Sequence, residues 1–251
     1  MKKTLTTVCF LCFASMMVWG QQLENRRFAF VAKAPMFNWI TTNDSGISSS
    51  GVNLGYSLGA NVEFALNDNI FMTGGLTFSG NNGGEVRHGT GGNFWPRARL
   101  SNRDWNEGVK PLPDDVELRY RINMLEIPIG LKFYTNYTGN RRFFFEVPIF
   151  SFGFLTSSRG DINAPGIEAR QEVIPEETRG IMFTVGGSAG ISYDVGFSEL
   201  FIGLHYQRAL TDLTRNNGRK AIDIGGGQFT TADEISRHIM QGIGIKMGIL
   251  F

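Results

Sequence analysis

At 251 residues the chain could form one large domain or two small ones, so length does not decide the fold. Its 32 glycines and 21 phenylalanines, with only 19% charged residues, indicate many strands with small residues at crowded positions and a large aromatic surface. The formal net charge of +1 gives no sign of a nucleic-acid partner or an acidic substrate.

Residues 1–20 have the pattern of a secretory signal peptide. Lys2 and Lys3 supply a positive start, and a mostly apolar run then ends at Gly20. Both cysteines, Cys9 and Cys12, fall inside this leader, so we expect residues 21–251 to form one barrel domain without disulfides. A lipoprotein would need a cysteine at the cleavage site. Beyond the leader no uncharged apolar run approaches the ~18 residues of a membrane helix, so any membrane span must consist of strands.

The clearest strand signal lies between Val52 and Leu66. Every even position there is apolar and every odd position is small or polar, which predicts one apolar face. The run exceeds the ~5 to 6 residues of an ordinary strand and fits a tilted membrane strand of ~9 to 11 residues with wet ends. Before it, a weaker alternation predicts a strand over Phe28–Ile40, with a distortion at Pro35, and then a loop over Thr41–Gly51.

Six more strands are predicted downstream. The third covers Ile70–Ser79, and a long polar loop follows over Gly80–Asp115. The fourth covers Val116–Tyr134, where the apolar positions change parity at Asn123 and Met124, which we interpret as a β-bulge. The others are Arg142–Leu155, a strand around residues 181–193, Glu199 to about Leu210, and about Ile235 to Phe251, with loops over Ser157–Thr178 and Thr211–Glu234.

These strands number eight, and long and short connections alternate between them. The pattern predicts an all-β fold, an eight-stranded antiparallel up-and-down transmembrane β-barrel in the bacterial outer membrane, with short turns and both termini in the periplasm. A soluble lipocalin-like barrel also has eight strands, but its exterior would not carry the Asn, Gly, Ser, Glu, Lys and Gln seen opposite the apolar face. We expect a monomer with lipid as its main partner.

The last strand and the aromatic residues agree with this fold. Ile243 to Phe251 alternate apolar residues with glycines and Lys246, and a C-terminal phenylalanine on such a strand resembles the assembly signature of outer-membrane barrels. Aromatic residues near the strand ends predict interfacial girdles. They are Phe28, Phe64, Phe71, Tyr134, Phe143 and Phe251 toward the periplasm, and Trp39, Tyr56 and Tyr120 toward the outside.

The inward face of the predicted barrel carries charged and polar groups. An eight-stranded barrel is only just wide enough for side chains to fill, so paired charges there would close the lumen, although conduction, gating or binding remain alternatives. A symmetric turn would set Glu146 opposite Gly130 and diagonal to Lys132, and Pro128 opposite Pro148, so Glu146→Ala should leave Lys132 unpaired. The candidate lumen residues are Glu63, Arg119, Arg121, Glu126, Lys132, Glu146, His205 and Lys246.

The segment Leu125 to Lys132 reads LEIPIGLK and resembles the PorT-like family of outer-membrane barrels. The glycine-rich stretch Gly186 to Asp194, the leader and the terminal Phe251 extend this resemblance in outline over the whole chain. The resemblance implies an eight-stranded outer-membrane barrel. It also implies a possible accessory role in type IX secretion, because the best-known member of the family belongs to that apparatus, whereas most members have no assigned role.

No enzyme motif is found, so we predict no catalytic residues, no cofactor and no metal site. His88, His205 and His238 lie far apart in the sequence, and a lipase-like set of His205 with a serine and an acid is a weaker alternative to a hydrogen-bonded lumen histidine. Trp95 and Trp105 among arginines could bind a surface ligand, but nearby acidic residues favour an ordinary solvated loop. The expected function is a binding, assembly or accessory role in the cell envelope, with a small-solute porin or a lipid-modifying enzyme as alternatives.

Overall fold

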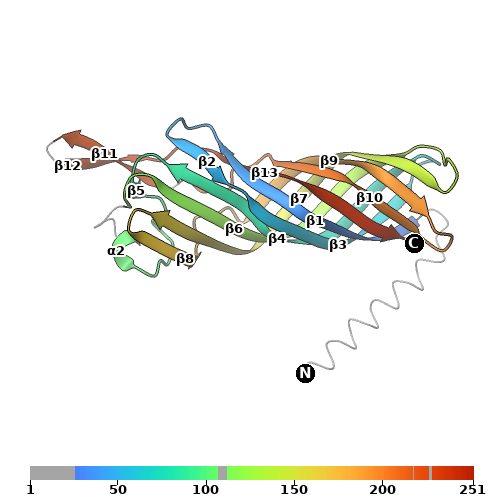
Figure 1. The fold of residues 1–251 in the computed structure, drawn as a ribbon, viewed down its shortest axis with the longest axis horizontal. Coiled ribbons are helices and arrows are strands. Elements are labelled where there is room, and N and C mark those ends of the chain that lie inside the picture. The colour runs from blue at the N-terminus through green and yellow to red at the C-terminus, as the bar shows by residue number, and fades with distance from the viewer. Residues whose placement is uncertain (1–25, 107–111, 217, 226–227) are drawn as a thin grey trace, which may run out of the picture.

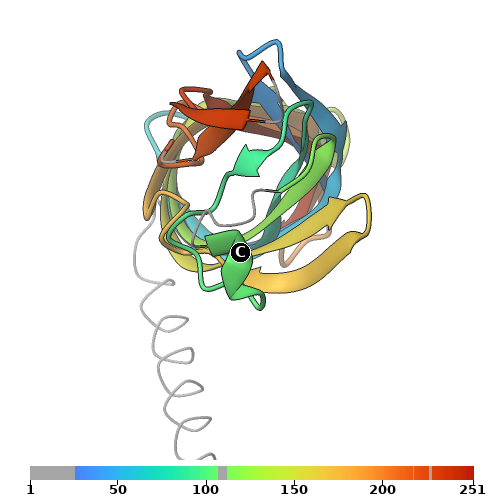
Figure 2. The same cartoon turned by 90° about the vertical axis from the view of Figure 1, so that its left-hand side faces the viewer.

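The computed structural model describes residues 26–106, 112–216, 218–225 and 228–251. The predicted signal peptide, residues 1–20, lies outside them. Eight strands close into an antiparallel barrel in which each pairs with the next along the chain and the last pairs with the first, so the predicted fold is confirmed (Figures 1 and 2). They are β1 (Arg26–Thr42), β3 (Asn53–Ala65), β4 (Ile70–His88), β6 (Val116–Tyr134), β7 (Arg141–Ala164), β9 (Ile181–Asp194), β10 (Glu199–Ala209) and β13 (His238–Leu250).

The two ends of the barrel differ. At one end, the terminal end, lie Arg26, Phe251 and the three short turns at 66–69, 135–140 and 195–198. The opposite end, the loop end, carries all the longer connections, and Figure 1 shows them gathered there. They contain β2 (Ile47–Gly51), β5 (Gly92–Asn93), the short helix α2 (Arg103–Asn106), β8 (Ile167–Val173), β11 (Arg219–Gly225) and β12 (Gln228–Asp233).

Several predicted strand ends are wrong at the loop end. β4 continues to His88 rather than ending at Ser79, and β7 continues to Ala164 rather than Leu155. The predicted loops therefore contain structure: β2 pairs with β4, β8 with β7, and β11 with β12. These extra segments alternate only weakly in hydrophobicity because they do not contact lipid, so period-two analysis alone misses them.

An apolar belt surrounds the half of the barrel toward the terminal end. On β6, Leu125, Ile127 and Ile129 point outward and are exposed, and corresponding residues on the other strands do the same, among them Leu58, Leu76, Phe145, Phe152, Phe183, Ile202, Leu204 and Ile243. From Leu125 to Phe133 the belt spans roughly 20 Å along the axis at ~3.3 Å per residue and ~40° tilt, close to the ~25 Å of outer-membrane barrels.

The polarity of the wall inverts beyond this belt. All even residues of β6 from Val116 to Tyr134 are buried except Pro128, which is half-buried, so the strand keeps one alternation throughout. Below Met124 the inward residues are polar and the outward ones apolar, and above it Leu118, Tyr120 and Ile122 are the buried apolar set. The predicted bulge in β6 is therefore wrong. The apolar side changes because the surroundings change from lipid to water, and the extra residues at this level belong to β4 and β7.

The loop end has its own hydrophobic core. Residues from the upper wall, from the connection between β4 and β6, and from the segment after β8 pack together, among them Ile40, Val86, Phe94, Trp95, Leu112, Leu118, Tyr120, Ile162, Ile174, Leu213 and Met240. The predicted aromatic girdle is also partly wrong. Tyr120 lies inside because of this inversion, and Phe71 and Tyr134 line the lumen at the terminal end, whereas Tyr56, Phe143 and Phe251 are exposed outside the barrel. No helix within the described residues is long and apolar enough to cross a membrane.

Candidate functional site: a closed lumen and a folded mouth

Ion pairs fill the lumen near the terminal end. Glu63, on β3, receives hydrogen bonds from Lys132 Nζ at 2.6 Å and from Tyr134 Oη at 3.1 Å. Glu199, at the start of β10, accepts from Arg142 Nε at 2.7 Å, and Arg27 bridges Glu63 and Glu199 at 3.1 and 3.2 Å. The charged groups of these cations lie over aromatic rings: Lys132 Nζ is 4.7 to 4.9 Å from the ring centroids of Tyr134, Phe144 and Phe201, and Arg27 Cζ is 4.1 Å from that of Phe71.

A second tier of charge lies farther along the lumen. Glu146 is paired with Lys246 and accepts from Thr73 Oγ1 at 3.1 Å, while Glu126 accepts hydrogen bonds from Ser79 and Ser151. The predicted pairing of Glu146 with Lys132 is wrong, because Lys132 bonds to Glu63 instead. The predicted register is wrong as well. Lys132 lies directly opposite Glu146 because the turn is centred on Gly139 rather than on Thr138, and Pro128 lies opposite Ser151 because the bulge at Val147 and Pro148 adds one more residue to β7.

His205 lies above this tier, buried within the lumen. Its Nδ1 is 2.9 Å from Ser188 Oγ and its Nε2 is 3.3 Å from Gln207 Oε1. The structure thus brings a serine and a histidine together, but Gln207 occupies the position where a hydrolytic triad needs a carboxylate. Because both side chains face the packed lumen, the contact accounts for the histidine as a hydrogen-bonded interior group.

Arg119 and Arg121 are not lumen residues. Both side chains lie on the outer surface of the loop-end half, where Arg119 Nε donates to Glu85 at 2.7 Å and Arg121 pairs with Asp161 at 2.5 Å. The prediction placed them inside because it assigned a bulge to β6. With the alternation continuous, odd residues face outward, and above the apolar belt the outside is water. Of the candidate lumen charges, Glu63, Glu126, Lys132, Glu146 and Lys246 are the ones inside the barrel.

The mouth of the barrel at the loop end is closed by the plug segment, residues 91–100. Figure 2 looks into this end and shows β5 crossing the ring of strands. Trp95 is 2% exposed, packs edge-on against Tyr120, and its Nε1 donates to Tyr120 Oη at 3.1 Å. A carboxylate fixes the segment from the side, because Glu177 accepts a hydrogen bond from the backbone N–H of Arg97. Trp95 is thus a core residue and not part of a surface patch.

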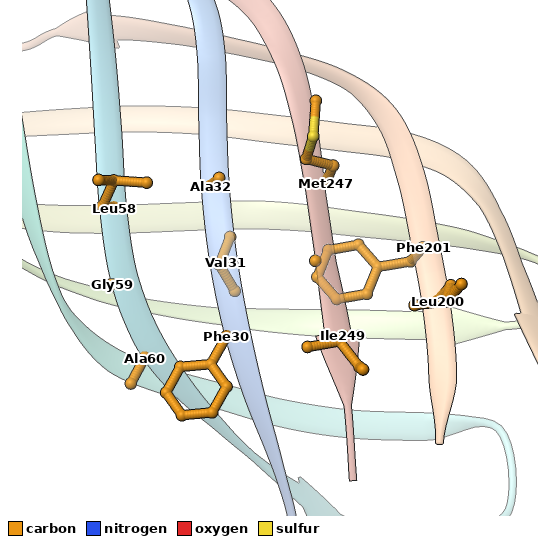
Figure 3. A pocket seen from close by; sticks show the side chains of 11 residues that line it. Phe30, Val31, Ala32, Leu58, Gly59, Ala60, Leu200, Phe201, Met247 and Ile249 are labelled. Carbon is orange, nitrogen blue, oxygen red and sulfur yellow. The ribbon is translucent and has the colours of Figure 1, made fainter. Parts of the chain in front are cut away.

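An apolar hollow of about 750 Å³ lies on the outside of the barrel, across β3, β1, β13 and β10. Small residues leave the space between larger apolar side chains, as Gly59 does beside Leu58 and Gly248 beside Ile249 (Figure 3). Its lining is apolar and lies within the belt, so acyl chains of the surrounding lipid would fill it. It gives no access to the lumen charges.

A hairpin formed by β11 and β12 projects beyond the mouth. Ile222, Ile224 and Phe229 are 45%, 60% and 64% exposed on it, well away from the apolar belt. At its base, the backbone N–H of Ala221 donates to Gly91 O at 2.8 Å and Lys220 pairs with Asp44. Exposed apolar side chains outside a membrane are typical of a surface that binds a partner.

The loop end also brings together two histidines that the sequence analysis treated as unrelated. His88 and His238 lie on either side of Glu234 in the loop-end interior. Burial lowers the pKa of His88 to about 3 and raises the pKa of Glu234 to about 7, the latter against the hydrogen bond from Ser236. The only local signal in the sequence was the spacing of four between Glu234 and His238, and His88 reaches them through the tertiary structure alone.

A family model described as outer membrane protein beta-barrel domain matches residues 22–215 of this chain. No curated protein matches it. Among solved structures it is similar to Neisserial surface protein A (11% identity, TM-score 0.40, covering 90% of this chain and 95% of that one). It is also similar to Ail, the attachment invasion locus protein of Yersinia pestis (9% identity, TM-score 0.36, covering 91% of this chain and 100% of that one). A third similar structure is the outer membrane protease OmpT of Escherichia coli (10% identity, TM-score 0.41, covering 92% of this chain and 97% of that one).

The last of these comparisons corrects one prediction. The sequence analysis took the absence of familiar catalytic motifs to mean that the chain is not an enzyme. OmpT is described as a protease, so barrels similar to this one include an enzyme, and the exclusion of catalysis is overturned.

Proposed function

The chain belongs to the outer membrane protein β-barrel domain family, and from this premise we propose that it is a non-conducting barrel that binds a partner through its folded loop end. The lumen supports this proposal because it is closed twice, by ion pairs toward the terminal end and by the plug segment at the mouth. The observation that carries it is the β11–β12 hairpin, whose Ile222, Ile224 and Phe229 are exposed to water rather than lipid.

We propose that the loop end faces the outside of the cell and the terminal end the periplasm. Short turns and long loops are distributed in this way in bacterial outer-membrane barrels. The ion pairs of Arg119 with Glu85 and of Arg121 with Asp161 require water on the loop-end side of the belt. In the proposed state the barrel is a monomer surrounded by lipid, since each barrel strand already has a neighbour on both sides.

Photocrosslinking in living cells tests the binding role. A photoreactive phenylalanine analogue at position 229 is expected to give a protein adduct that disappears when Ile222 and Ile224 are both changed to serine. The matched control places the analogue at Phe143, which is 55% exposed within the belt and should react with lipid. Equal adducts at both positions, or an adduct at 229 that survives the serine changes, would contradict the proposal.

The narrower assignment, an accessory of type IX secretion, rests on the PorT-like segment LEIPIGLK. Here Leu125, Ile127 and Ile129 face lipid, and Glu126 and Lys132 fill the lumen, so barrel architecture alone accounts for the segment. Comparing secreted and periplasmic proteins with and without this chain tests the assignment: cargo trapped in the periplasm would support it, and unchanged profiles would eliminate it. The small-solute porin alternative requires measurable conductance in a planar bilayer, which the closed lumen argues against.

A further inference from the structure

Three potential metal ligands meet inside the loop end. His88 is the last residue of β4, His238 is the first of β13, and Glu234 lies in the segment that joins β12 to β13. Glu234 Oε1 is 3.9 Å from His88 Nδ1 and 3.8 Å from His238 Nε2, and the three ligand atoms all lie within 4.8 Å of one another. They come from segments far apart in the sequence, so the fold itself creates the cluster.

The cluster is buried and its nitrogens lack partners. His88 and His238 are each 1% exposed and Glu234 is 5% exposed. Neither ring nitrogen of His88, nor Nε2 of His238, has a hydrogen-bond partner in the protein. A buried polar group without a partner costs about 1–3 kcal/mol. Two of these nitrogens, His88 Nδ1 and His238 Nε2, lie near the Glu234 carboxylate, and leaving them without partners is expensive unless something between them supplies the missing interaction.

The surrounding residues orient these side chains. His238 Nδ1 is 3.2 Å from Thr214 Oγ1, and with the Nδ1 proton directed there, Nε2 keeps its lone pair facing Glu234. Ser236 Oγ donates to Glu234 Oε1 at 2.7 Å. The ring of Phe94 lies over His88 with centroids 3.9 Å apart. Metal-binding histidines are typically fixed by this kind of outer hydrogen bond.

We propose that His88, Glu234 and His238 bind one divalent transition-metal ion, of which Zn²⁺ fits best. Two imidazoles and one carboxylate form a ligand set that zinc uses, whereas Ca²⁺ and Mg²⁺ require more oxygen ligands. Bonds of ~2.0 to 2.1 Å in a tetrahedral site separate ligands by roughly 3.4 Å, so the two distances from Glu234 to the histidines would shorten by about 0.5 Å, and the histidine nitrogens, which lie within 4.8 Å of each other, would also move together. A cavity of about 10 Å³, lined by Glu234 and Thr214 but by neither histidine, lies beside the cluster and has room for about one water.

The ion would join the barrel wall to the hairpin. β4 and β13 are wall strands, and Glu234 closes the base of the β11–β12 hairpin through the hydrogen bond from its N–H to Gly218 O at 2.8 Å. Metal binding would therefore fix the position of the hairpin against the mouth. This inference rests on the cluster alone and does not depend on what the hairpin binds.

Titration of the untagged, refolded chain with Co²⁺ tests the proposal. We expect one equivalent to bind with the visible absorption of a tetrahedral site and to be displaced by Zn²⁺. The variants His88→Asn and His238→Asn should each weaken binding by about 100-fold or more. The matched control, His205→Asn, removes the buried lumen histidine and should bind as the unaltered chain does. Circular dichroism establishes that each variant is folded.

Thr214→Ala provides a second variant that keeps every ligand. It should weaken Co²⁺ binding by about 10-fold, because it removes only the hydrogen bond that orients His238. Zn²⁺ should also slow proteolysis of residues 212–237 in the unaltered chain. The proposal is overturned if Co²⁺ does not bind stoichiometrically, or if His88→Asn and His205→Asn bind it alike.

Discussion

Glu146 is the residue at which the lumen can be tested most directly. It is 3% exposed as a side chain, pairs with Lys246, and accepts from Thr73 Oγ1 at 3.1 Å. Replacing it with methionine preserves most of the volume but leaves the Lys246 ammonium, 5% exposed, without its counter-charge. Removing one partner of a buried ion pair costs about 3–5 kcal/mol, so Glu146→Met should lower the free energy of unfolding by roughly that amount.

Two double variants identify the partner. Glu146→Met with Lys246→Met replaces the whole pair by apolar groups and should recover most of the loss, because such replacements are often neutral or stabilising. Glu146→Met with Lys132→Met should recover nothing and should lose more, because Lys132 bonds to Glu63 at 2.6 Å. The second variant distinguishes the observed pairing from the one predicted by sequence symmetry.

Reversible urea unfolding in lipid vesicles, followed by tryptophan fluorescence, gives these free energies. The reasoning is refuted if Glu146→Met lies within about 1 kcal/mol of the unaltered chain, since a buried ammonium would then need no counter-charge. It is also refuted if Lys132→Met rescues Glu146→Met as well as Lys246→Met does. An unchanged m value shows that the variants unfold from the same compact state.

Three further predictions concern the loop end. Trp95→Ala should destabilise the mouth by about 3–5 kcal/mol and expose it to protease. Conductance in planar bilayers should stay at zero, because the lumen ion pairs remain. A conducting variant would show that the plug segment alone closes the barrel. Arg121→Cys in intact cells should react with a membrane-impermeant maleimide while Glu126→Cys does not, whereas an Arg121→Cys as unreactive as Glu126→Cys would restore the predicted bulge in β6, which placed both residues in the lumen. The hydrogen bond from Lys220 holds the pKa of Asp44 below its usual 3.8. The contact therefore stabilises the hairpin base fully above about pH 4, and this stabilisation is lost as the pH falls below the folded pKa. Proteolysis of residues 212–237 should rise at that low pH, and Asp44→Asn should remove this acid response.

The sequence predicts the barrel well because its strongest signal is local. Alternation over Val52–Leu66 predicts β3 to within a residue at each end, and the short turns set the order of neighbouring strands. Glu146 shows what the local alternation does not predict. Its position on the inward face follows from parity, but its position opposite Lys132 depends on the centre of the turn, and its partner Lys246 lies 100 residues away in the sequence.

The larger error has a different origin. Periodicity identifies which side of a strand is apolar. It does not say whether that side faces lipid or the interior of the protein, and this must be assumed. In β6 the sequence was interpreted as if lipid lay outside along its whole length, which moved Arg119 and Arg121 into the lumen. The cluster of His88, Glu234 and His238 was missed for another reason: it is created by contacts between distant segments, which no spacing rule could reveal.

The inversion of polarity along the wall also fixes how deep the barrel can sit. Just beyond the apolar belt, the outward side chains of Glu85, Arg119, Arg121 and Asp161 form two ion pairs on the neighbouring strands β4, β6 and β7. If the barrel moved toward its terminal end, these ion pairs would enter the hydrocarbon, where an arginine costs about 2–4 kcal/mol at the midplane. If it moved the other way, the apolar belt would be exposed to water. The strands themselves therefore determine the depth of the barrel in the membrane. They hold the loops at a constant height above the lipid surface, as binding to a partner on that surface would require.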